Sequence, residues 1–227
     1  MSRSRDCGGR LGPACVAACV LLAGLSSVAS AADIETRDYA VIVGSKPAGE
    51  VHVTIHKHTN GSTYVKCDTD VKVKIGLIEH KFIYRGVEVW KDMRLIKFDS
   101  RTDDNGKQFI VSAAAEKGGV RVKVNNVEKM VPAHVWLTSY WSLPDPKLRN
   151  QELPLLEADT GKELSGKLKF VATEKLKVCG QEIPLNHYKL TGKVNVDLWY
   201  DGGDRLVRQE WIESGHKTLV ELVRVRQ

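Results

Sequence analysis

The sequence predicts an all-β protein made of antiparallel strands, with one or two short helices. From Tyr39 onward, runs rich in Val, Ile, Thr and aromatic residues alternate with polar residues, which is the period of a half-buried strand. These runs end at turn-forming residues such as Asn60-Gly61, a pair that favours a tight turn with two positive φ angles. The composition, 42% hydrophobic and 27% charged, is that of a globular protein with a substantial core.

Residues 1–31 have the pattern of a signal peptide. A basic start precedes an apolar segment at residues 14–25, and Ala29-Ser30-Ala31 places small residues where a signal peptidase accepts them. We therefore expect cleavage after Ala31 and a periplasmic or secreted protein. The apolar segment is too short to span a bilayer and no later segment is long enough, so no transmembrane anchor is expected. Cleavage also lowers the formal net charge of +6, and nucleic acid is not an expected partner.

Residues 32–227 are expected to form a single antiparallel β domain of about a dozen strands. Asn60-Gly61 separates the first clear hairpin pair, residues 50–58 and 62–75. The other expected hairpin tips are Asp103-Asp104-Asn105-Gly106, Asn125-Asn126, Asp201-Gly202-Gly203 and Ser214-Gly215. The expected strands are residues 38–43, 50–58, 62–75, 80–90, 93–101, 107–115, 119–129, 164–178, 181–191, 193–200, 205–213 and 216–226.

One region, residues 132–161, interrupts the strand pattern. Its prolines break the period of two, and three aromatic residues gather in it, Trp136, Tyr140 and Trp141. These aromatic side chains would share one face of a short helical turn at residues 133–142. The region is expected to be a crossover, or lid, within the β domain.

Removal of the signal peptide leaves Cys67 and Cys179 as the remaining cysteines, in an oxidising compartment. A disulfide between them would close a long loop, which the chain-entropy model values at about 4 to 5 kcal/mol. The alternative is two unpaired thiols, and the sequence leaves both open. Neither cysteine lies in a C-x-x-C pair, so a metal site built on them is not expected.

Signatures of common enzymes and of bound cofactors are absent from the sequence. The segment from Gly161 to Lys167 has the spacing of a phosphate-binding loop, but Leu168 follows it where Ser or Thr must hold magnesium. No serine-hydrolase elbow, zinc-protease helix or calcium loop is present. We expect no cofactor and favour a non-enzymatic protein.

A set of short motifs occurs in an order that resembles a known family. The motifs are Gly44-Ser45-Lys46-Pro47-Ala48-Gly49-Glu50, Glu88-Val89-Trp90, Asp103-Asp104-Asn105-Gly106, Ser139-Tyr140-Trp141, Asp159-Thr160-Gly161 and Trp199-Tyr200-Asp201. From about Tyr39 to Val225 the chain resembles the bacterial secreted domain-of-unknown-function family 6134. The resemblance implies a fold like that of periplasmic proteins with an unclosed β-barrel, a single strongly curved antiparallel sheet whose concave side holds apolar ligands in lipoprotein carriers.

Aromatic residues are the candidate ligand-binding residues under this hypothesis. The concave side of a half-open barrel must be covered by a lid or a ligand, because a large exposed apolar surface promotes aggregation. An apolar small molecule or lipid would contact Trp90, Trp136, Tyr140, Trp141 and Trp199. The alternative is that these rings only fill the interior.

Histidines and a glutamate provide two further candidates. His52, His56 and His58 share one face of a strand, but only His56 and His58, about 7 Å apart, lie close enough to chelate one metal ion. The alternative is an outward polar face. Glu88 faces the same way as Trp90 and is a candidate for burial in an ion pair with an arginine such as Arg85 or Arg94.

The sequence therefore favours an exported, non-enzymatic protein that binds or carries an apolar molecule. A scaffold that binds another envelope protein through its sheet edges is the first alternative. A metal-binding enzyme centred on His56 and His58 is the second.

Overall fold

The described residues form one 15-stranded sheet. The computed structural model describes residues 33–75, 78–213 and 215–227, so the predicted signal peptide lies outside the described residues. The strands are β1 (Asp33–Val43), β2 (Lys46–Lys57), β3 (Ser62–Ile75), β4 (Ile78–Lys91), β5 (Arg94–Asp104), β6 (Lys107–Glu116), β7 (Gly119–Val124), β8 (Val127–Val131), β9 (Trp136–Leu137), β10 (Glu152–Leu156), β11 (Glu163–Val178), β12 (Gln181–Gly192), β13 (Val196–Tyr200), β14 (Leu206–Glu213) and β15 (His216–Arg226).

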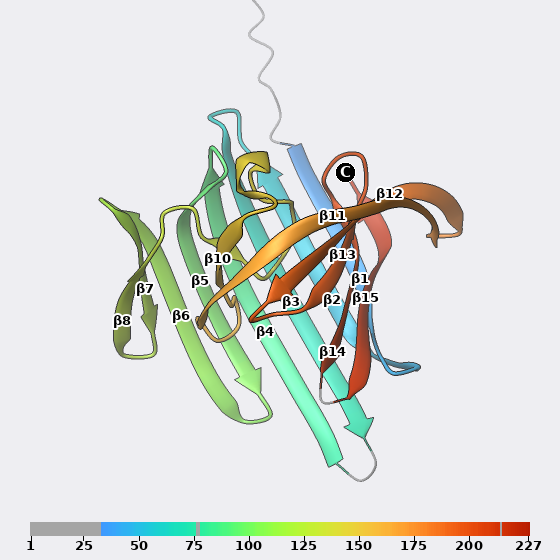
Figure 1. Ribbon diagram of the computed structural model, residues 1–227. Coiled ribbons are helices and arrows are strands. Elements are labelled where there is room, and N and C mark those ends of the chain that lie inside the picture. Colours follow the sequence, from blue (N-terminus) through green and yellow to red (C-terminus); the bar gives the residue numbers. More distant parts are fainter. Residues whose placement is uncertain (1–32, 76–77, 214) are drawn as a thin grey trace, which may run out of the picture. The chain divides into compact units, whose positions relative to one another are not determined.

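The sheet is strongly curved and is not closed into a barrel (Figure 1). Its spatial order is β8-β7-β6-β5-β4-β3-β2-β1-β15-β14-β13-β12-β11-β10-β9, so the first and last strands of the chain pair with each other and β8 and β9 form the two edges. Every neighbouring pair is antiparallel except β9 and β10, which are parallel. The predicted all-β class and unclosed antiparallel sheet are confirmed, with more strands than predicted.

Three strands account for the larger number. The prediction of one strand at residues 119–129 is wrong, because Asn125 has φ 52° and the chain turns there between β7 and β8. The predicted crossover contains β9 and β10, which join the edge of the sheet.

The predicted helical turn at residues 133–142 is also wrong. Trp136 belongs to strand β9, and the one helix among the described residues is the 3-10 helix η1 (Pro146–Leu148). Asp145 caps η1 by accepting a hydrogen bond from the Lys147 N–H, and Pro146 occupies the first turn, where its missing N–H costs nothing. No helix in the described part of the chain has the length and apolar character that crossing a bilayer requires.

Interruptions in strand register bend the sheet. The pairing shifts between Asp38 and Tyr39 in β1, between Val89 and Trp90 in β4, and between Phe170 and Ala172 in β11. An extra residue in one strand of a pair increases the local twist and bends that strand. The curvature therefore has local causes distributed around the sheet.

The crossover lies over the concave face of the curved sheet (Figure 1). Ser100, Thr102 and Tyr200 face it, because their hydroxyl groups bond crossover backbone. Ser100 Oγ donates to the Ala158 carbonyl and Thr102 Oγ1 to the Asp159 carbonyl, both at 2.7 Å. These bonds join β5 to the segment between β10 and β11, although the two regions share no strand pairing. The unclosed sheet is thus held in its curled form by side chains that bond crossover backbone.

The core is continuous from the sheet into the crossover. Its largest fully buried side chains come from β2, β5, β9, β10, β11, β12 and β13. They are Tyr200, Phe98, Ile55, Leu95, Leu137, Leu153, Leu155, Leu156, Leu168, Leu185, Leu190 and Leu198. The crossover contributes four of these leucines and so fills part of the concave face itself. One space that remains open to a ligand lies at the rim of the crossover.

Candidate functional site: an aromatic groove at the crossover rim

The β4–β5 turn forms one wall of the candidate site. Lys91 pairs with Arg94, so the turn contains only Asp92 and Met93, with φ 51° and 59°. Two-residue turns of this kind favour Asn-Gly, and a non-glycine residue at positive φ costs on the order of 1 to 3 kcal/mol. The strained turn leaves the Met93 side chain half exposed.

Glu88 orients two tryptophans of the site. Glu88 and Trp90 lie two residues apart on β4, and the Trp90 Nε1–H donates to Glu88 Oε2 at 2.6 Å. The Trp141 Nε1–H, from the crossover, donates to the same oxygen at 2.9 Å. Glu88 therefore fixes both indole rings, whose centroids are 6.4 Å apart.

Glu88 is 1% exposed, and its other oxygen, Oε1, has no hydrogen-bond partner among the described residues. Burial raises the pKa of this carboxyl above its usual range, against the opposing effects of the nearby Ser139 hydroxyl and of the two indole donors. The predicted ion pair with Arg85 or Arg94 is wrong: Glu88 bonds indole N–H groups, and Arg85 instead bonds both carboxylate oxygens of Asp70. Arg85 cannot reach Glu88 because side chains alternate between the two faces along β4, and Arg85 points to the opposite face from Tyr84 and Glu88.

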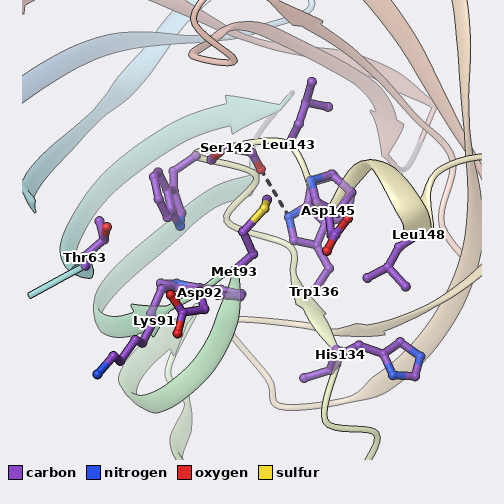
Figure 2. Close-up of a pocket in the computed structure, with 15 residues that line it drawn as sticks. Thr63, Lys91, Asp92, Met93, His134, Trp136, Ser142, Leu143, Asp145 and Leu148 are labelled. Atoms are coloured by element: carbon purple, nitrogen blue, oxygen red, sulfur yellow. Dashed lines mark hydrogen bonds between the residues drawn. The ribbon is translucent and has the colours of Figure 1, made fainter.

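An open cavity of about 280 Å³ lies between the β4–β5 turn and the crossover (Figure 2). We call it the aromatic groove. It is lined by Gly61, Thr63, Trp90, Lys91, Asp92, Met93, His134, Val135, Trp136, Trp141, Ser142, Leu143, Pro144, Asp145 and Leu148. Its volume is just below the usual range of small-molecule sites, roughly 300 to 1,000 Å³, so it suits a small molecule or one end of a larger one.

Trp136 completes the aromatic wall of the groove. Its Nε1–H donates to the Ser142 carbonyl at 3.2 Å, a bond drawn in Figure 2. Tyr140, in contrast, does not line the groove. It is 3% exposed, packs edge-on against Trp136 with centroids 4.9 Å apart, and its carbonyl accepts a hydrogen bond from the Tyr200 hydroxyl.

Trp199 lies elsewhere. Leu198 and Tyr200 flank it on β13 and face the concave side, so Trp199 points to the convex face. There it stacks on the imidazole of His187 with centroids 4.3 Å apart, and Arg208 lies over the ring. Of the five aromatic residues predicted to contact a ligand, the structure brings Trp90, Trp136 and Trp141 together and separates Trp199 from them.

The histidine candidates do not converge with other ligands. His56 packs edge-on against Tyr64 and His58 lies in the β2–β3 turn, while His52 is engaged by Asp38 at 2.8 Å. Within the residues that the structure describes, no group of three or more His, Cys, Asp or Glu side chains is arranged to hold a metal ion.

Cys67 and Cys179 are both free thiols. Cys67 is buried in β3, and burial raises the pKa of its thiol to about 12. Cys179 is exposed at the β11–β12 turn, where its thiol approaches the Leu222 carbonyl at 3.5 Å. The disulfide that the sequence left open is therefore not formed in the structure.

Several groove residues were not predicted from the sequence. Asp92, Met93, Leu143 and Asp145 lie in turns or irregular segments and Leu148 ends the short helix η1, and in such places alternation of polar and apolar residues carries no information. For Asp92 and Met93 a signal did exist, because a strand ending near residue 90 and another starting near 93 require a tight turn between them.

Together these features define an all-β protein with a curved, unclosed antiparallel sheet and an aromatic groove at the rim of its crossover. Residues 39–223 match the family DUF6134, a domain of unknown function, and the chain belongs to that family. The predicted family resemblance is thereby confirmed.

Comparison with solved structures supports the fold. Ten chains match. One is described as a beta-barrel-like protein of domain of unknown function DUF1849 from Brucella abortus, and it aligns with a TM-score of 0.61. The alignment covers 85% of this chain and 96% of that chain at 8% sequence identity, so it shows a shared fold alone. No curated protein matches.

Proposed function

We propose that this protein is exported and binds a small apolar molecule in the aromatic groove without transforming it. The observation that carries the proposal is the lining of the groove: Trp90, Trp136 and Trp141 meet there with the half-exposed Met93. Apolar lining with a few polar groups is typical of small-molecule sites. The sequence carries no signature of a common hydrolase or metalloprotease, which favours binding over catalysis.

The position of the groove modifies the carrier hypothesis. A carrier with a hollow interior would hold its ligand beneath the crossover, but here Leu137 and Leu155 of the crossover are fully buried on the concave face. A ligand in the groove would instead lie between the crossover and the β4–β5 turn. The flexible Met93 side chain suits such a site because it adapts to differently shaped ligands.

Binding is tested by calorimetric titration of the purified protein with 1-hexanol, a neutral probe small enough for the groove. We expect saturable binding that Met93→Gly weakens about threefold to tenfold, since burying an apolar side chain against a ligand contributes roughly 1 kcal/mol or more. Glycine suits the positive φ of this turn, so the variant should keep its stability. Asn125→Gly, at φ 52° in the β7–β8 turn, is the matched control and should bind like the wild type.

Absence of hexanol binding by the wild-type protein would refute the proposed function. Equal affinity of the wild type and Met93→Gly would place the bound hexanol outside the groove. Native mass spectrometry of protein purified from its host adds a second readout, because an apolar molecule that co-purifies should be lost more readily from Met93→Gly.

Export is tested by cell fractionation together with N-terminal sequencing. The signal-peptide pattern predicts a product that begins at Ala32 and lies outside the cytoplasm. A cytoplasmic product that retains residues 1–31 would contradict it.

A second candidate function, a scaffold for an envelope protein, is favoured by the edge strand β8. Val127 and Met130 of this strand are 71% and 47% exposed, and an unpaired edge can accept a partner strand. A photo-reactive amino acid in place of Val127 should cross-link one stoichiometric partner in intact cells, whereas the same label at the exposed Glu182 of β12 should not. Identical cross-linking patterns at the two positions would exclude β8 as a docking edge.

A further inference from the structure

We propose that the aromatic groove selects cationic amphiphiles, specifically a methylated ammonium group on a short apolar body. This inference rests on the proposed function, because it names the class of apolar molecule that the same groove would take. It follows from three properties of the groove: its indole rings have no free donor, its acidic side chains are not neutralised, and its volume suits a small organic cation.

The indole N–H groups that line the groove are all used within the protein. Those of Trp90 and Trp141 donate to Glu88, and that of Trp136 donates to the Ser142 carbonyl. The positively polarised N–H edges are therefore engaged, and what remains for a ligand is the exposed carbon surface of the rings. This surface is small on Trp90 and Trp136, which are 9% and 5% exposed, and larger on the partly buried Trp141. The faces of such rings carry negative potential. An anion finds no hydrogen-bond donor on this surface, whereas a cation is attracted by its negative potential.

The charges around the groove favour the same sign. Asp92 and Asp145 line it, and neither forms a salt bridge with a basic side chain in the described part of the chain. Asp145 accepts one bond, from the backbone N–H of Lys147. Glu88 lies behind the Trp90 and Trp141 rings with one oxygen unpartnered.

Two basic residues also line the groove, Lys91 and His134. Figure 2 shows both side chains directed away from the space beside Met93. The Met93 sulfur points toward that space. Among the described residues, Asp92 and Asp145 thus remain on the lining without a salt bridge to Lys91 or His134.

Size and hydrogen bonding select the form of the cation. A fully methylated ammonium group has no N–H to donate, so it loses no hydrogen bond when it leaves water for indole rings that offer no acceptor. Aromatic cages are a known means of binding such groups. A cavity of about 280 Å³ holds this group and a short chain. A complete two-chain lipid would not fit, so we commit to a free small cation.

The experiment compares three probes with the same six-carbon chain: hexyltrimethylammonium, 1-hexanol and hexanesulfonate. Each is titrated calorimetrically into the full-length protein at low ionic strength. The cation should bind at least tenfold more tightly than 1-hexanol, and the sulfonate more weakly than 1-hexanol. Added salt should reduce the advantage of the cation.

Asp92→Asn combined with Asp145→Asn removes the rim charges with little change of shape. This double variant should lose at least threefold of the advantage of the cation and keep its affinity for 1-hexanol. Glu182→Gln removes one acidic charge from the exposed part of β12 and should leave the preference unchanged.

The outcomes separate the two proposals. Binding of 1-hexanol with no preference for the cation would overturn the charge selectivity and leave the proposed function standing. Failure of every probe to bind would overturn both. A preference for the cation that survives in the Asp92→Asn, Asp145→Asn variant, or that Glu182→Gln removes equally, would overturn the assignment to the groove.

Discussion

Gly161 provides a direct test of how the crossover packs on the sheet. It has φ +68°, and a Cβ atom added to it would lie 2.5 Å from Val124 Cγ2 of β7 and 3.0 Å from Val111 Cγ1 of β6. The backbone after β10 therefore approaches the concave face of two strands with which it shares no pairing. Gly161→Ala should be costly for two separate reasons, backbone conformation and steric overlap.

Each cost has an expected size. An L-residue in the left-handed region costs about 1 to 2 kcal/mol. Forcing one methyl group into packed space costs about 1 to 3 kcal/mol. Gly161→Ala should thus lower the free energy of unfolding by about 2 to 5 kcal/mol.

Gly44 supplies the matched control. It has nearly the same φ, +64°, at the β1–β2 turn, and an added Cβ would meet no atom within 4 Å. Gly44→Ala should therefore show only the backbone cost of about 1 to 2 kcal/mol. The difference between the two variants isolates the steric overlap with Val111 and Val124.

Urea unfolding followed by tryptophan fluorescence measures both variants. We expect a lower midpoint for Gly161→Ala than for Gly44→Ala at an unchanged slope. Equal losses in the two variants would mean that Gly161 does not pack against β6 and β7, and the curled arrangement of the sheet around the crossover would be refuted with it.

Three further predictions concern stability and reactivity. Leu155→Ala in β10 should cost about 2 to 5 kcal/mol in urea unfolding, because the side chain is fully buried; a loss below 1 kcal/mol would contradict burial of the crossover. The pKa of Glu88 is raised in the folded state, so its contribution to stability is fully present below the ordinary value of 4.5 and is lost as the pH rises through the folded pKa. The free energy of unfolding of the wild type minus that of Glu88→Gln should therefore increase as the pH falls from neutrality to below 4.5, and a difference independent of pH would show that Glu88 is not buried as described. Iodoacetamide followed by peptide mapping should label Cys179 in the native protein and Cys67 only after unfolding, because Cys67 is buried and its thiol pKa is raised to about 12; rapid labelling of native Cys67 would count against its place in the core.

Local patterns accounted for most strands. Alternation of apolar and polar residues placed β3 at its observed bounds, and Asn60-Gly61 located the turn that precedes it. The same method treated β7 and β8 as one strand, although Asn125-Asn126 was recognised as a turn. It missed β9 and β10 because two strands of two and five residues, one containing Pro154, are too short and irregular to show a period.

The candidate site was predicted in part. Trp90, Trp136 and Trp141 were selected for their residue type, and the structure places them around one groove. Trp199 was selected on the same basis and lies on the convex face, which its position beside Tyr200 could have indicated, since consecutive strand residues point to opposite faces. The bonds from two indoles to Glu88 join β4 to the crossover and leave no trace in the local sequence.

By itself the sequence determined the all-β class, the positions of most hairpins and a signal-peptide pattern, because each depends on residues that are neighbours in the chain. Tertiary structure decided which way the long sheet curls, what fills its concave face, and that a 280 Å³ groove remains beside the β4–β5 turn. These features depend on contacts between distant segments, such as Ser100 with Ala158 and Glu88 with Trp141, and on whether side chains fill the space between them. Strand periodicity assigns a residue to a face, but only packing in three dimensions determines which faces meet.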